Sequence, residues 1–111
     1  MTITIIGTVT ARPEYRDELQ AILSRQVAPT RAEGGCINYD FHVDAADDCV
    51  FVFYENWRSQ EHLDQHMKMP HLVPLLSQID RLLAKPVEIR HLRMIGNPAT
   101  LASIQGIGLL D

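Results

Sequence analysis

The sequence lacks the features that direct a protein to a membrane or to nucleic acid. No apolar run approaches the roughly 20 residues that a membrane-spanning helix needs. Ten Lys and Arg residues against fourteen Asp and Glu residues give a formal charge of −4, so no basic surface is expected to attract phosphate groups. Residues 1–10 also lack the basic region and the small-residue cleavage site of a signal peptide. We therefore expect a cytoplasmic protein with no nucleic-acid partner and no membrane partner.

Cysteine is scarce, and its two copies are not expected to form a disulfide. Cys36 and Cys49 are predicted to begin neighbouring antiparallel strands, at opposite ends of a hairpin and about 23 Å apart at ~3.3 Å per residue. A disulfide needs Cα atoms within ~7 Å of each other. The sequence also has no glycine-rich phosphate loop, no nucleophile elbow, no HExxH and no CxxC. The common signatures of nucleotide, hydrolase and metal chemistry are therefore not present.

The first half of the chain predicts a strand, a helix and a hairpin. Its 111 residues are 46% hydrophobic and 22% charged, which suits one globular core. The alternating, β-branched run over residues 2–10 predicts a strand. Apolar residues spaced by three and four predict an amphipathic helix from Pro13 to about residues 28–32, with a kink or an end expected at Pro29. Gly34 and Gly35 stop it. Residues 36–43 and 49–57 then predict two strands of a hairpin with a five-residue loop.

The second half predicts two helical stretches and a last strand. Ser59 is a plausible N-cap for a short helix to about Met67. Leucines and isoleucines from Leu72 to Leu83 predict a second amphipathic stretch, and residues 87–95 predict a strand. The order β-α-β-β-α-β is the split βαβ pattern. We therefore expect an α+β, ferredoxin-like domain over residues 1–95, with a four-stranded antiparallel sheet and both helices on one face.

One predicted strand indicates that the protein is a homodimer. Residues 49–54 are apolar at nearly every position, so both faces of this strand should be covered. The two helices can cover only one face, and the sheet of an identical subunit is the simplest cover for the other. Residues 96–111 carry a single charged side chain. This tail is either a free terminus or a segment that docks on the partner subunit.

Aromatic residues of the hairpin are predicted to share one face of the sheet. With a five-residue loop, the residue numbers of cross-strand partners add up to 92, which pairs Phe41 with Phe51 and Tyr39 with Phe53. A one-residue bulge would bring His42 to this face in place of Tyr39. The face then holds an aromatic wall, which could be plain core or the side of a pocket. Its members are Tyr39, Phe41, Phe51, Phe53 and Trp57.

Histidines are the other candidates for chemistry. His62 and His66 lie four residues apart and could share a zinc ion, but no third ligand is evident, so no metal site is predicted. His66 and His71 flank the predicted break between helices, where a pocket rim is common. A neutral imidazole there could be a general base, or it could merely bond to the backbone. Glu55, beside Trp57, is more often a structural carboxylate than a catalytic one.

Two segments resemble a known family. The run YENWRSQE over residues 54–61, followed by His66 and by Pro70-His71, resembles the YExWxSxE…H…PH signature of the antibiotic biosynthesis monooxygenase family. The segment TRAEGGC over residues 30–36, with Tyr39, resembles the family's helix-to-strand junction, with Gly34 in place of the usual proline. The resemblance covers residues 3–95.

The resemblance implies a dimeric α/β barrel and, in many members, oxygenation of phenols or quinols with O2 and without a cofactor. It implies His66 or His71 as base or orienting donor. Phe53 stands where an antibiotic-pathway branch has Asn, which favours a quinol-type monooxygenase. Two alternatives stay open: an isomerase or degradation enzyme for a small oxygenated metabolite, and a non-catalytic ligand-binding dimer. The predicted catalytic residues are His66, His71 and Trp57, and the predicted substrate-binding residues are Tyr39, His42, Phe51, Phe53 and Leu72, with no metal ion and no cofactor.

Overall fold

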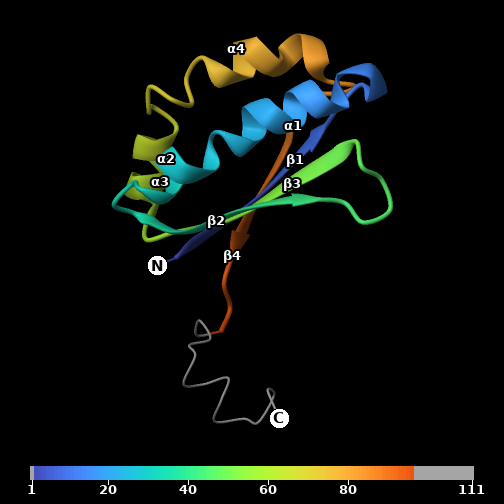
Figure 1. Cartoon of the computed structure of the whole chain (residues 1–111). Helices are drawn as coiled ribbons and strands as arrows, with labels where there is room; N and C mark the ends of the chain where they lie inside the picture. Colours follow the sequence, from blue (N-terminus) through green and yellow to red (C-terminus); the bar gives the residue numbers. More distant parts are fainter. Residues whose placement is uncertain (1, 97–111) are drawn as a thin grey trace.

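Four antiparallel strands form the sheet on which the rest of the molecule is built. The computed structural model describes residues 2–96 (Figure 1). The strands β1 (Ile3–Thr10), β2 (Cys36–Val43), β3 (Val50–Trp57) and β4 (Glu88–Arg93) lie in the order β2-β3-β1-β4. Each neighbouring pair is antiparallel. All helices lie on one face of the sheet, so the predicted α+β, ferredoxin-like architecture is confirmed (Figure 1).

The first predicted helix is divided into three pieces. A 3₁₀ turn η1 (Pro13–Tyr15) leads into α1 (Arg16–Ser24), and α2 (Val27–Arg31) follows after a short break. Pro29 explains the break, because a proline has no N–H for the bond that a continuous helix would need at this position. Within the first turn of a new helix the same residue is tolerated, since those N–H groups have no helical partner.

The later helices are short. The helix α3 (Gln60–His66) begins at Ser59, whose side chain accepts a hydrogen bond from the His62 backbone N–H, as predicted for an N-cap. The second amphipathic stretch is helical only as α4 (Leu75–Ile79) and the 3₁₀ turn η2 (Asp80–Leu82), since Pro70 and Pro74 delay its start. No helix among residues 2–96 has the length and apolar character to span a bilayer.

The hairpin register differs from the predicted one by two residues. Phe41 lies opposite Phe53, whereas the predicted five-residue loop would pair Phe41 with Phe51. The cause is the loop: Asp44 Oδ1 accepts from the backbone N–H of Ala46 and Asp47, and residues 44–50 lie between the paired residues Val43 and Phe51. Because a shift of two keeps every side chain on its face, the predicted aromatic face is confirmed. Its residues Tyr39, Phe51, Phe53 and Trp57 are buried, and Phe41 packs beside them.

The core fills the space between this face and the helices. Leu19 and Leu23 of α1 and Ile79 of α4 are almost fully buried in the same core cluster as Phe51 and Trp57 of β3. Both cysteines are free thiols, as predicted. The predicted docking of the tail concerns residues that lie outside the described part, apart from Gly96.

Gly35 joins α2 to β2 where two segments come into close contact. Its carbonyl oxygen accepts a 2.9 Å hydrogen bond from the Arg58 backbone N–H, which ties the junction to the start of α3. A Cβ atom at this position would overlap the His62 side chain, whereas a Cβ atom at Gly34 would meet no atom within 4 Å. Glycine at position 35 is therefore a steric requirement.

We predict that Gly35→Ala destabilises the protein and that Gly34→Ala does not. The added methyl group must displace the His62 side chain from its Cβ atom outward, and with it the start of α3, which should lower the free energy of unfolding by about 1–3 kcal/mol. Urea unfolding followed by circular dichroism measures the change, with Gly34→Ala as the matched control. The double variant Gly35→Ala/His62→Ala should recover little of the loss, because Cβ of His62 itself overlaps the position of the added methyl group. Equal stability of the two alanine variants would contradict the proposed overlap.

Candidate functional site

A cavity of about 220 Å³ lies between the inner face of the sheet and the helices α1, α3 and α4. Most of its lining is aliphatic or aromatic, so a ligand inside it would contact mainly apolar side chains. The polar groups are few and come from different elements, which is typical of small-molecule sites. The main apolar lining residues are Ile5, Val9, Leu23, Phe53, Leu63, Leu72, Leu75, Ile79 and Ile89.

The sheet side of the cavity carries a polar row and an apolar row. Glu55 lies opposite Tyr39 on β2 and opposite Ile5 on β1, and Ile5 in turn lies opposite His91 on β4. All four line the cavity. In the neighbouring row Gly7 lies between Phe53 and Ile89, and its lack of a side chain leaves depth in the middle of the floor.

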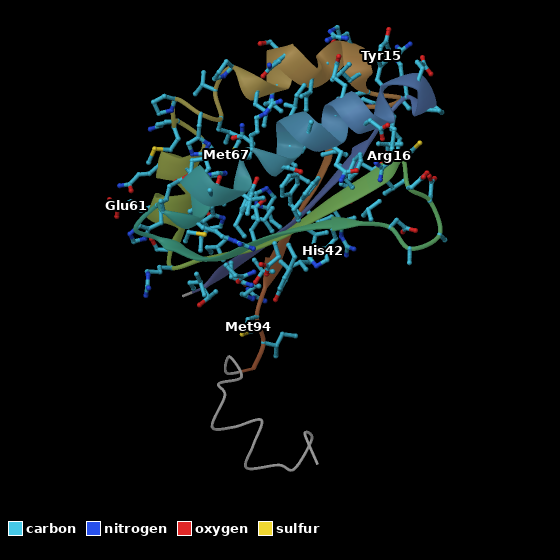
Figure 2. All side chains as sticks on the ribbon, viewed as in Figure 1. Tyr15, Arg16, His42, Glu61, Met67 and Met94 are labelled. Carbon is cyan, nitrogen blue, oxygen red and sulfur yellow. The ribbon has the colours of Figure 1, made fainter. Side chains whose placement is uncertain are left out.

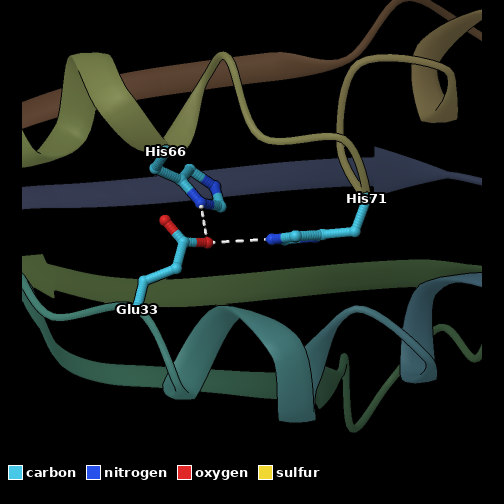
Figure 3. Close-up of side chains that lie close together, drawn as sticks. All are labelled: Glu33, His66 and His71. Atoms are coloured by element: carbon cyan, nitrogen blue, oxygen red, sulfur yellow. Dashed lines mark hydrogen bonds and ion pairs between the residues drawn. The ribbon is translucent and has the colours of Figure 1, made fainter.

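Glu33 connects two histidines beside the cavity. Its Oε2 atom lies 2.8 Å from Nδ1 of His66 and 2.9 Å from Nε2 of His71 (Figure 3). Because an ionised carboxylate only accepts hydrogen bonds, each of these two ring nitrogens donates. The other ring nitrogen of His71, Nδ1, lies 2.8 Å from Oε1 of Gln26. The α2–β2 junction, the end of α3 and the segment before α4 are thereby held together.

His66 has the protonation state that a general base needs. Burial lowers its pKa from the usual value, and this effect outweighs the Glu33 contact, which raises the pKa. The ring is therefore neutral near pH 7. Its single proton lies on Nδ1, facing Glu33, so Nε2 keeps a free lone pair. His66 lines the cavity, and Nε2 has no hydrogen-bond partner within residues 2–96.

Trp57 supports the polar groups from behind. Its side chain is fully buried and does not line the cavity. The indole Nε1–H donates a 2.9 Å hydrogen bond to Oε1 of Glu55, and the ring centroid lies 4.5 Å from that of His66. A single aromatic side chain thus positions both the buried carboxyl group and the candidate base.

Two further cavity groups resist ionisation. Burial raises the pKa of Glu55 to about 7, and the nearby Glu33 adds to this effect, while the hydrogen bond from Trp57 opposes it. Burial, with a smaller contribution from Glu55, raises the pKa of Tyr39 far above its usual value. Tyr39 is therefore a neutral phenol that can donate a hydrogen bond.

The structure brings together only part of the predicted site. His66, Tyr39, Phe53 and Leu72 line the cavity. His71 and Trp57 reach it only through Glu33, Glu55 and His66.

Two predicted residues lie elsewhere. Phe51 is fully buried in the core and stacks on Phe41, with the ring centroids 5.5 Å apart. His42 is exposed on the face of the sheet opposite to the helices (Figure 2). The register shift lies between Cys36 and Asn38, before Tyr39, so it leaves Tyr39 facing the helices and His42 facing away.

Sequence reasoning missed Gln26 and Glu33, the two residues that contact the histidines. Gln26 and Thr30 follow Leu19 and Leu23 at helical spacing, so they interrupt the apolar stripe with polar side chains, and both are buried. Buried polar groups on a core stripe need partners, which was a usable signal for Gln26. Glu33 belongs to the TRAEGGC junction, but no local pattern indicated that it contacts His66 and His71.

His62 and His66, the pair considered and rejected as zinc ligands, belong to different hydrogen-bonded groups. His62 bonds through Nδ1 to Ser59 Oγ at 2.8 Å and is not brought together with His66. Ligand atoms of Glu33, His66 and His71 instead lie within 4.8 Å of one another. Two imidazoles and a carboxylate are a donor set that zinc accepts. A bound ion would have to replace both protons that now lie between the histidines and Glu33.

We predict that Glu55→Gln changes how stability depends on pH. A carboxyl group with a raised pKa favours the folded state while it is protonated, and this contribution is lost as pH rises from about 4.5 to about 7. Glutamine keeps an acceptor for Trp57 and does not ionise. Relative to Glu55→Gln, the wild type should therefore lose about 2–3 kcal/mol between pH 4 and pH 8. Urea unfolding at several pH values measures this difference, and parallel curves for the two proteins would contradict it.

Comparisons with known proteins agree with this architecture. The family model described as antibiotic biosynthesis monooxygenase matches residues 2–73. A protein of Mycobacterium tuberculosis named "Putative monooxygenase Rv0793" is 37% identical over 87 residues, which cover 78% of this chain and 85% of that protein. Its solved structure superimposes with a TM-score of 0.84 and 32% identity, covering 89% of this chain and 100% of the other.

Two further proteins are similar over most of the chain. The crystal structure of PA3566 from Pseudomonas aeruginosa has a TM-score of 0.81 and 35% identity, covering 86% of this chain and 95% of that one. The uncharacterized protein sll1783 of Synechocystis is 35% identical over 88 residues, which are 79% of this chain but only 60% of that longer protein. The family match and the similarity to Rv0793 together show that this chain belongs to the antibiotic biosynthesis monooxygenase family.

Proposed function

We propose that this protein is a cofactor-independent monooxygenase that oxidises a small phenol or quinol with O2. The observation that carries the proposal is His66, a buried neutral imidazole whose Nδ1 is engaged by Glu33 and whose ring lines an apolar cavity. Membership of a monooxygenase family supports the reaction type. The cavity of about 220 Å³ is smaller than the ~300–1,000 Å³ of sites for drug-sized ligands, which favours a substrate of one or two rings.

The proposed reaction needs only the substrate, O2 and a base. His66 Nε2 accepts the phenolic proton, and the resulting electron-rich phenolate passes electrons to O2. For a simple phenol, one oxygen atom enters the ring to give a quinone and the other leaves as water. The substrate supplies the electrons, so the overall step phenol + O2 → quinone + H2O balances without a metal ion or flavin. The apolar walls limit the contact of the reactive intermediate with water and polar groups.

The residues around His66 have distinct proposed roles. Glu33 and His71 are positioning residues, because they hold the tautomer and orientation of His66 without reaching the cavity. Tyr39 is a hydrogen-bond donor to the substrate, and Phe53 and Leu72 form part of its apolar wall. Trp57 fixes the His66 ring from behind.

We predict that His66→Gln lowers oxygen consumption by about 10²–10⁴-fold with the hydroquinone that the wild type oxidises best. Glutamine cannot accept the phenolic proton. An oxygen electrode and a panel of phenols and hydroquinones measure the rate. His62→Gln is the matched control, since this histidine lies on the same helix but bonds to Ser59 outside the cavity. Since the pKa of His66 is lowered, the wild-type rate should persist below the ordinary histidine pKa of ~6.5.

Different outcomes of this assay identify the alternatives. Unchanged turnover in a folded His66→Gln variant would contradict the base role. Conversion of a ligand without oxygen uptake would point to an isomerase or degradation enzyme, and binding without turnover would point to a ligand-binding protein. Elemental analysis that finds one zinc or iron atom per chain, with activity lost on chelation, would contradict the cofactor-independent scheme.

We also infer that the protein is a homodimer that packs through the outer face of the sheet. This face carries the half-buried Ile6 and Val52 together with Tyr54 and Leu92, which are each 39% exposed. Ile6 lies opposite Tyr54 on one side and Arg90 on the other, so the apolar groups adjoin across strands. A stable interface should bury more than about 1,000 Å² in total.

We predict that light scattering at micromolar concentration reports about twice the chain mass of 12.6 kDa. Tyr54→Asp should produce a monomer, because a charge on the packed face would be desolvated without a partner. Val73→Asp is the control, since Val73 is 61% exposed in the segment between α3 and α4. A wild-type monomer, or a Tyr54→Asp dimer of unchanged affinity, would contradict the inferred interface.

A further inference from the structure

Glu55 is a cavity carboxyl group for which the reaction scheme above has no role. It lies on the central strand β3, is 8% exposed and lines the cavity. Most buried carboxylates pair with a cation. No ion pair within residues 2–96 includes Glu55, since the described ion pairs use other acidic residues. The one hydrogen bond of the Glu55 side chain within residues 2–96 comes from the indole N–H of Trp57.

The two oxygen atoms of Glu55 differ in their surroundings. Oε1 accepts the Trp57 indole N–H at 2.9 Å. Oε2 has no hydrogen-bond partner among the described residues. Over residues 2–96, the fully buried side-chain oxygens without a partner are Thr10 Oγ1 and Thr30 Oγ1, so Oε2 of Glu55 is still accessible. Oε2 is therefore the oxygen that remains open, and the cavity is the space that Glu55 lines.

Glu55 and His66 adjoin the same part of the cavity. Trp57 contacts both, through its N–H to Glu55 and through its ring to His66. Tyr39 lies opposite Glu55 across the strand pair, and its ring centroid is 5.9 Å from that of His66. A flat ligand between the sheet and α3 can thus present one edge to the imidazole and another to the carboxyl group.

We propose that Glu55 Oε2 holds a second oxygen atom of the substrate by donating a carboxyl O–H, so that the site selects aromatic compounds with two oxygen substituents. One oxygen faces His66 Nε2 and is deprotonated, and the other is bound by Glu55. The contact between His66 and the first oxygen rests on the proposed function. The contact between Glu55 and the second oxygen does not depend on O2, because it concerns binding alone.

The proton on Glu55 suits this role near neutral pH. A neutral carboxyl group can donate a hydrogen bond, whereas a carboxylate can only accept one. With a pKa of about 7, raised chiefly by burial, the group is largely protonated at pH 6 and largely ionised at pH 8. The titratable groups around it on the packed elements are Glu33, Cys36, Tyr39, His66 and His91, and Asp64 of α3 lines the same cavity.

Anaerobic binding tests the proposal without turnover. The probes are 1-naphthol and its analogues 1,2- and 1,4-dihydroxynaphthalene, which share a ring system and differ in the second oxygen. Trp57 is the single tryptophan of the chain and contacts both Glu55 and His66, so its fluorescence reports binding. At pH 6 we expect at least one diol to bind the wild type about tenfold more tightly than 1-naphthol.

Two variants of Glu55 and one control separate the proposal from a purely structural role. Glu55→Leu should abolish the preference for the diol. Glu55→Gln keeps both an acceptor for Trp57 and an N–H donor, so it should keep the preference for the diol. In 4-methoxy-1-naphthol the second oxygen can only accept, so the wild type should prefer this probe to 1-naphthol at pH 6 but not at pH 8, whereas Glu55→Gln should prefer it at both. Glu61→Gln makes the same chemical change at an exposed residue of α3 that points away from the cavity, and it should behave as the wild type (Figure 2).

The proposal is overturned if the wild type binds the diols and 1-naphthol equally, or if its preference for 4-methoxy-1-naphthol over 1-naphthol is the same at pH 6 and pH 8. Should Glu55→Leu fail to fold, the pH comparison between the wild type and Glu55→Gln still decides. Diol preference without oxygen uptake in air would refute the monooxygenase and leave the Glu55 contact standing. Oxygen uptake with no diol preference would refute only the Glu55 contact.

Discussion

The arrangement of this site depends on one carboxylate oxygen. Oε2 of Glu33 accepts hydrogen bonds from His66 and His71, which lie 33 and 38 residues further along the chain. Both contacts are largely removed from water, with side-chain exposures of 8% for Glu33, 4% for His66 and 21% for His71. Leaving a buried donor without its partner costs about 1–3 kcal/mol. The Glu33 carboxylate therefore fixes where α3 ends, how the following segment returns, and which nitrogen of His66 carries the proton.

The chemistry follows from how charge is distributed around that oxygen. Burial keeps His66 neutral, and Glu33 directs its proton to Nδ1, so the free lone pair lies on the nitrogen that Glu33 does not occupy. A hydrogen bond from Trp57 connects Glu55 to the network. Burial of Glu55 disfavours the ionised form of its carboxyl group. One side of the cavity thereby holds a base and another holds a weak acid. Such a pair within apolar walls can bind and deprotonate a phenol without forming an unpaired charge in advance.

Local patterns were sufficient for most of the fold. Alternation over β1 and β3 and the spacing of Leu19 and Leu23 depend only on neighbouring residues, so strands, helices and their inner faces could be predicted. The break in the first helix near Pro29 followed from the same local reasoning. The error arose in the hairpin, where a side chain competes with the backbone: Asp44 lengthened the loop, which moved the register by two residues while leaving the faces unchanged.

The sequence by itself determined the fold class, the family and the aromatic face, because each depends on periodicity or on a motif that is contiguous in the chain. Only the tertiary structure decided which candidates meet at the cavity. It placed His66 at the cavity and His71 behind Glu33, buried Phe51 in the core, and turned His42 to the opposite face of the sheet. It also gave Glu33 and Glu55 their partners. Contacts between residues tens of positions apart depend on how α3 packs over the sheet, and no local pattern encodes that distance.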